Sequence, residues 1–213
     1  MKTNSEIRQE TLALMKGNWK QAVIVTIVYL LVIFAGSFVT SLVGKGIGGP
    51  VGNAVQEILS LLVSLLVVYP MAFSLVKLFL GFVRGEQQLH AGGLFGGFAS
   101  PYYGKSIGLY LLTVIFTFLW TLLLIIPGVI KSLSYALAPY ILAENPELTA
   151  NEAINRSMEM MKGHKMALFL IILGYAGFAL LSVLALGIPL LWIHPYYQAV
   201  FVKFYEEVKA ANK

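Results

Sequence analysis

The sequence predicts an all-α membrane protein, a single domain over residues 1–213 with about six transmembrane helices. Hydrophobic residues make up 58% of the chain and charged residues only 12%. A soluble domain carries about 25% charged residues to cover its surface, so this chain has too little polar surface for water. Long runs without Asp, Glu, Lys or Arg, such as residues 21–44 and 166–202, are each long enough to cross a bilayer as a helix.

These runs are apolar on all sides, whereas the strands of a membrane β-barrel alternate apolar and polar residues. Helices are therefore expected, some of them broken by proline at Pro70, Pro127 and Pro139. The predicted spans are residues 19–43, 56–82, 106–126, 128–143, 166–186 and 189–208.

The fourth span is only 16 residues long, and two threadings of it compete. It either crosses the membrane as a short or partly re-entrant span, or it lies along the surface and leaves five spans. With six spans and a cytoplasmic amino terminus, 13 of the 15 Lys and Arg lie inside, and only Lys45 and Lys131 face outward. Five spans would move Arg156, Lys162 and Lys165 outside, against the positive-inside rule. The charge pattern therefore predicts six spans with both termini cytoplasmic.

A polar helix is predicted at residues 149–162. Thr149 and Glu152 form the Thr-x-x-Glu pattern of a capping box, and Gly163 ends the helix. Glu152 and Arg156 are spaced to pair across one turn. We expect this amphipathic helix to lie in the headgroup plane on the cytoplasmic side, with docking to a partner as the alternative.

The residues that catalysis or metal binding would require do not come together in the sequence. Cysteine is absent, and the three histidines have no His, Asp or Glu partner at metal-ligand spacing on a common helix. The net charge of +5 comes from basic residues at the ends of apolar runs, so it indicates topology and lipid contact rather than nucleic-acid binding. We therefore expect no enzyme activity, cofactor or metal site. The candidate functional or structural residues are Pro127, Lys131, Pro139, Arg156 and His164.

A weak internal regularity involves Pro70, Pro127 and Pro195. Each follows a run rich in Leu, Ile and Val and precedes a lysine by four to eight residues. The pattern is typical of a threefold helix-pair repeat, but it is equally compatible with chance in an apolar sequence.

Four stretches of the second half of the chain carry a family resemblance: Ile126-Pro127-Gly128, Pro139-Tyr140-Ile141-Leu142, Asn145-Pro146-Glu147-Leu148 and Met161-Lys162-Gly163-His164-Lys165. In these stretches the sequence resembles the DUF975 family of uncharacterised bacterial membrane proteins. The Pro-Tyr-Ile-Leu element is also similar to one in the membrane domains of some glycerophosphodiester phosphodiesterases. This chain has no hydrolase part, so no activity carries over. The resemblance implies a bacterial plasma-membrane protein.

Two functions from different classes are consistent with these observations. The first is a non-enzymatic scaffold or accessory in lipid or envelope processes, in contact with membrane lipids and with either a membrane-protein partner or further copies of itself. The second is a small transporter or export subunit that uses the proline-broken segment 127–143, because such breaks can expose backbone groups to a substrate.

Overall fold

The fold is that of a computed structural model, which describes residues 2–212. Within these residues the regular elements are all helical. They are α1 (Asn4–Met15), α2 (Trp19–Ile47), α3 (Gly49–Val63), the π-helical turn η1 (Ser64–Val68), α4 (Tyr69–Val83), the 3-10 segment η2 (Ala91–Phe98), α5 (Tyr102–Leu123), α6 (Ile125–Tyr135), α7 (Ala138–Glu144), α8 (Ala150–Met160), α9 (Lys165–Leu184) and α10 (Leu190–Ala211).

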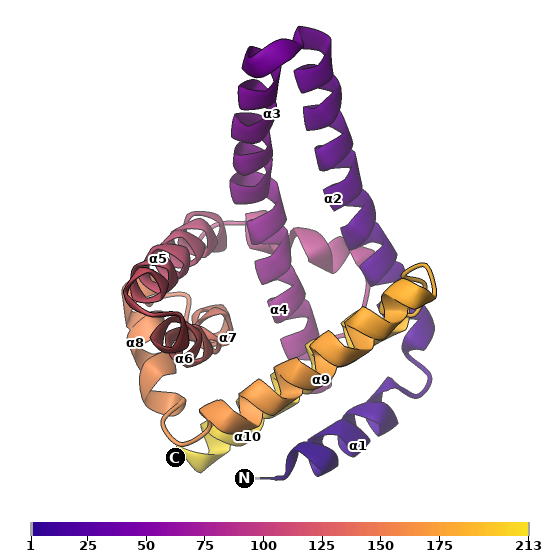
Figure 1. The fold of residues 1–213 in the computed structure, drawn as a ribbon. Helices are drawn as coiled ribbons and strands as arrows, with labels where there is room; N and C mark the ends of the chain where they lie inside the picture. The colour runs from indigo at the N-terminus through magenta and orange to yellow at the C-terminus, as the bar shows by residue number, and fades with distance from the viewer. Residues whose placement is uncertain (1, 213) are drawn as a thin grey trace.

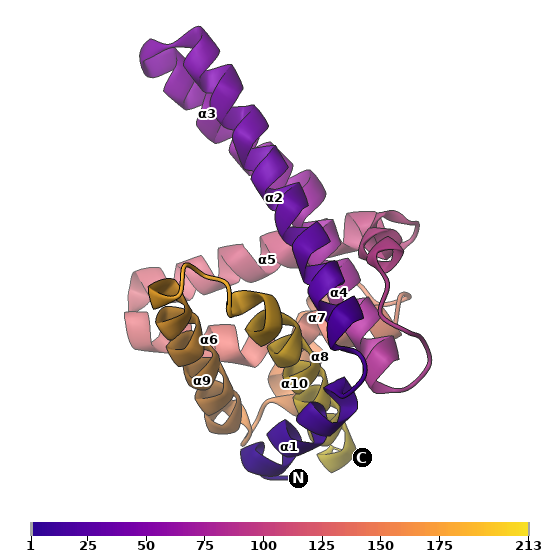
Figure 2. The ribbon, with the colours of Figure 1, turned by 90° about the vertical axis from the view of Figure 1, so that its right-hand side faces the viewer.

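The long helices pair into three hairpins. In hairpin 1, α2 packs against α3, and α3 continues through η1 into α4. In hairpin 2, α5 packs against α6, and α6 is followed by α7. In hairpin 3, α9 packs against α10. Hairpin 1 projects well clear of the other helices, and the three hairpins point in different directions (Figures 1 and 2). We call α2, α5 and α9 the first arms, and the helices that return from the three tips the second arms.

The second arms meet, whereas the first arms remain largely exposed. α4 contacts both α7 and α10, and these three helices supply about half of the buried side chains. By contrast, α5 buries only Ser106 and Leu109. The tips are apolar and exposed, with Ile126 at 74% and Leu186 at 90% of full exposure. We call α1, η2, α7, α8 and the C-terminal halves of α4 and α10 the base.

Five helical stretches of residues 2–212 are long and apolar enough to cross a membrane. They are Trp19–Ile47, Gly49–Val83, Tyr102–Leu123, Ile125–Glu144 and Lys165–Leu184. α10, which covers the predicted sixth span, is not among them. Its second half carries Lys203, Glu206, Glu207 and Lys209 and belongs to the base.

The proline pattern of Pro70, Pro127 and Pro195 does not recur at one position of the three hairpins. Pro70, Pro139 and Pro195 lie part-way along the second arms. Pro127 lies instead in the first turn of α6, next to the tip of hairpin 2.

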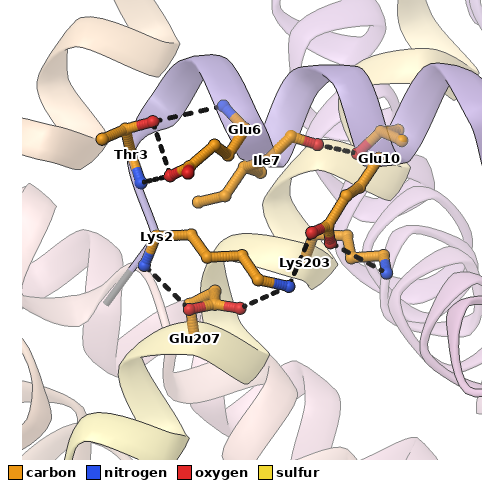
Figure 3. Close-up of polar contacts among 8 residues, drawn as sticks. Lys2, Thr3, Glu6, Ile7, Glu10, Lys203 and Glu207 are labelled. Carbon is orange, nitrogen blue, oxygen red and sulfur yellow. Dashed lines mark hydrogen bonds and ion pairs between the residues drawn. The ribbon is translucent and has the colours of Figure 1, made fainter.

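α1 is held along hairpin 3 by polar contacts with α9 and α10. Asn4 donates a hydrogen bond to the backbone oxygen of Ala167, at the start of α9, over 2.9 Å. Lys2 lies between two carboxylates, with Nζ 2.7 Å from Glu10 of α1 and 3.3 Å from Glu207 of α10 (Figure 3). The hydrogen bond from Lys2 lowers the pKa of Glu10 below its usual value of 4.5. These contacts bring the start of the chain to the end of the last helix.

The glycine-rich segment 91–98 packs on α4 beside the proline break. Ser74 donates to the oxygen of Pro70 over 2.8 Å and accepts a hydrogen bond from the N–H of Gly97 over 2.6 Å. A Cβ at Gly97 would lie 2.3 Å from the Pro70 oxygen, whereas a Cβ at Gly96 would meet nothing within 4 Å. Gly97 therefore permits a backbone approach that no larger residue allows.

We predict that Gly97→Ala destabilises the protein by about 2 kcal/mol, because the added methyl group must push η2 away from α4. Gly96→Ala is the matched control and leaves the stability unchanged. The thermal midpoint of each variant in detergent micelles measures the effect. Equal midpoints for the two variants would contradict the role given to this contact.

Candidate functional site

Glu144, the last residue of α7, joins the second arms of all three hairpins. One of its carboxylate oxygens pairs with the guanidinium of Arg84, at the end of α4. The other lies 2.6 Å from Nζ of Lys209 and accepts a hydrogen bond from the Tyr205 hydroxyl over 2.8 Å, both on α10. Arg84 also binds Glu206 of α10 through Nε and Nη2, at 2.8 and 2.6 Å. We call these five residues the Glu144 junction.

The junction is only partly open to water. The Glu144 side chain is 11% exposed, and Tyr205 is buried with its ring stacked on Tyr140 at a centroid distance of 5.2 Å. Water screens ion pairs in such a setting less than on an open surface, and removal of one partner leaves a charge without compensation. The junction therefore fixes how the three second arms meet.

The polar helix α8 packs on hairpin 2 next to the junction. Its predicted capping box is present, with Glu152 accepting hydrogen bonds from Thr149, and the bond from the Thr149 backbone lowers the pKa of Glu152. The fully buried Ser157 accepts from the N–H of Leu137 over 3.1 Å and donates to the oxygen of Ser134 over 2.7 Å. α8 thus supplies partners for backbone groups freed at the turn between α6 and α7.

A cleft of about 470 Å³ lies between α6, α8 and the start of α9. Lys131 of α6, Lys162 of the turn after α8 and Lys165 of α9 line it. Within residues 2–212, no carboxylate lies within ion-pair distance of any of these three ammonium groups. The other residues that line the cleft are Ser134, Asn155, Met158 and Glu159. We call this the lysine cleft.

The position of Lys131 contradicts the expectation that it lies on the opposite side of the membrane from Lys162 and Lys165. Its Nζ lies 4.0 Å from the Met158 sulfur of α8 and 4.6 Å from the centre of the Trp120 ring. It therefore shares a cleft with Lys162 and Lys165, which the charge pattern assigned to the inner side. Charge counting could not find this, because α8 folds back over the middle of the segment 125–144.

The other four sequence-predicted residues are not gathered at one place. Pro127 borders a shallow hollow at the tip of hairpin 2, and Pro139 lines a cavity of about 220 Å³ between α4, α5 and α6. Arg156 is exposed on α8, and its expected ion pair with Glu152 does not form within 4.0 Å. His164 is the N-cap residue of α9, directly before Lys165, and makes no side-chain cap.

The residues of the Glu144 junction were not among the sequence-predicted candidates. Glu144 and Lys209 look like ordinary charges at helix ends, and nothing in their spacing indicates that they meet. A signal was present in Glu144 itself, an acid that directly follows the apolar run 137–143. Within the described part of the chain, no group of three or more His, Asp or Glu is placed to hold a metal ion.

The comparison with protein families agrees with the resemblance in the sequence. The family described as a protein of unknown function (DUF975) matches residues 1–137 and 122–212, and so covers nearly all of the chain. The chain belongs to the DUF975 family. No curated protein and no solved structure matches it. This DUF975 protein is thus a helical membrane protein, and its function must be argued from its own geometry.

We predict that Glu144→Ala destabilises the protein by about 3 kcal/mol, because Arg84 and Lys209 lose the carboxylate between them. Glu147→Ala removes an exposed carboxylate three residues away and serves as the control. Thermal unfolding in micelles and limited proteolysis of the α7–α8 connection check the effect. A Glu144→Ala protein as stable as the Glu147→Ala protein would show that the junction does not hold the hairpins.

Proposed function

We propose that this protein is a non-enzymatic scaffold of the bacterial plasma membrane, which inserts its hairpins into the bilayer and presents its charged base at the cytoplasmic surface. The observation that carries the proposal is the contrast between the two ends of the hairpins. The first arms and the tips expose apolar side chains on most of their faces, while the second arms converge on the Glu144 junction. Lipid is the environment in which such arms are stable.

Contacts at the base support the proposed orientation with both termini cytoplasmic. The positive-inside pattern assigns four segments to the cytoplasm, around residues 1–20, 84–105, 144–165 and 203–213, and segments on one side of a membrane must be able to touch. They do so through hydrogen bonds from Lys2 N to Glu207 (3.0 Å), Lys105 Nζ to Leu148 O (3.1 Å) and Asn212 Nδ2 to Met160 O (3.3 Å). The Glu144 junction adds a further link among them.

The scaffold role follows from what the base offers. Its exposed face carries α8, with Glu152 and Arg156 directed away from the apolar core, beside the lysine cleft. Such a surface can hold lipid headgroups or the charged segment of a membrane protein. The hairpins then serve to fix this surface at a constant depth.

A transporter remains the second candidate, because Pro139 and its neighbours line a cavity between hairpins 1 and 2. Flux into proteoliposomes that Pro139→Ala abolishes would favour this function over the scaffold.

The proposed orientation can be tested by cysteine labelling, since the natural chain contains no cysteine. Single substitutions Glu147→Cys and Arg156→Cys at the base should react with an impermeant maleimide in inverted vesicles and not in intact cells. Lys45→Cys, near the tip of hairpin 1, should react in intact cells. Labelling of base positions from outside would overturn the proposal.

A further inference from the structure

We propose that the lysine cleft binds the phosphate headgroup of an anionic phospholipid whose acyl chains lie along α6 and α9. This inference rests on the proposed membrane location of the base and goes beyond it by naming a ligand class and a site. Three features of the molecule support the site: the charge of the cleft, the helix end beside it and the apolar surfaces that border it.

The cleft has an excess of positive charge. Lys131, Lys162 and Lys165 face one carboxylate, that of Glu159, so the lining carries a formal charge of +2. As noted above, none of the three ammonium groups has a carboxylate within ion-pair distance in residues 2–212. Elsewhere at the base, Lys2, Arg84, Lys203 and Lys209 are all paired with glutamates. The cleft therefore leaves cationic groups available for an anion.

The beginning of α9 adds donors next to the lysines. α9 has 20 residues, and its N-cap residue His164 makes no side-chain hydrogen bond to the first turn. The first backbone N–H groups of a helix have no partner within the helix, and they carry the positive end of its dipole. Together with Lys165, these N–H groups can bind phosphate oxygens.

Apolar surfaces border the cleft where acyl chains would lie. On α6, Val129 and Ile130 directly precede Lys131 and are each 45% exposed. On α9, Met166 and Leu170 follow Lys165 and are 67% and 49% exposed. α6 and α9 contact each other, so these apolar stretches of hairpins 2 and 3 lie on neighbouring helices beside the cleft. A free phosphate would use the lysines alone, whereas a phospholipid would use both the lysines and the apolar flanks.

The first test compares retained lipids by native mass spectrometry, after purification from mixtures of phosphatidylglycerol and phosphatidylcholine with identical acyl chains. The natural chain should retain phosphatidylglycerol preferentially, and Lys131→Gln/Lys162→Gln/Lys165→Gln should lower this preference at least tenfold. The control Lys16→Gln/Lys20→Gln/Lys45→Gln removes the same charge from exposed positions outside the cleft and should keep the preference. An equal loss in both triple variants, or no loss in either, overturns the proposal.

A second variant separates binding from folding. Glu159→Gln removes the one carboxylate of the cleft and should increase the retention of phosphatidylglycerol, which a merely structural role would not produce. If the triple variant does not fold, Lys162→Gln alone, at an exposed position, should still lower the preference several-fold. Unchanged retention in both single variants overturns the site.

Soluble competitors distinguish a lipid from a free anion. Inorganic phosphate and glycerol phosphate, added at millimolar concentration, should leave phosphatidylglycerol bound, because they lack the acyl chains. Complete displacement would show that the cleft takes a soluble phosphate and would overturn the lipid assignment. Cysteine labelling reports the orientation separately, so failure of the lipid site and failure of the proposed topology give different results.

Discussion

Glu144 ends a hydrophobic helix, and its two carboxylate oxygens meet cations from the other two hairpins. Arg84 reaches it from hairpin 1, and Lys209 with the Tyr205 hydroxyl reaches it from hairpin 3. In a chain with so few charges, this is the place where attraction between opposite charges can fix the arrangement of apolar hairpins. Burial of hydrocarbon side chains gives no hydrophobic driving force in a bilayer, because the lipid tails offer the same apolar surroundings, so close packing and polar contacts must fix the arrangement.

This constraint explains why the buried residues lie at one end of the molecule. Where the second arms converge, Tyr140, Phe204 and Tyr205 pack closely; toward the tips, Leu184 and Leu186 are 85% and 90% exposed. A soluble protein could not leave such surface uncovered, whereas a membrane protein can leave it to lipid. The polar helices α1 and α8 then complete the base on the side where the termini lie. The lysine cleft is a consequence of this arrangement, since α8 must cross hairpin 2 before the chain enters α9.

The sequence alone predicts the helices well and their assembly poorly. Charge-free runs indicate the long helices, and Thr149 with Glu152 indicates the capped helix, because both signals depend on neighbours in the chain. The Glu144 junction brings together residues as far apart as Glu144 and Lys209, which are 65 positions apart in the chain. The lysine cleft brings Lys131 to Met158, which is 27 positions away. A single sequence holds no signal for pairs at such separations. Lys131 illustrates the limit. A lysine within an apolar segment was a candidate, but its separation from Lys162 and Lys165 was wrongly expected, because the docking of α8 cannot be inferred from charge counts.

The three hairpins are joined at the base and diverge toward their tips. Spin labels on cysteines introduced in pairs at Lys45, Ile126 and Leu186, in nanodiscs, measure the distances between tips by pulsed electron paramagnetic resonance. Separations well beyond the ~10 Å spacing of packed helices are expected for all three pairs, with a single short distance for a control pair at Met160 and Asn212 of the base, which a hydrogen bond of 3.3 Å joins. Three short tip distances would show that the hairpins close into a compact bundle in the membrane, and would contradict this divergence.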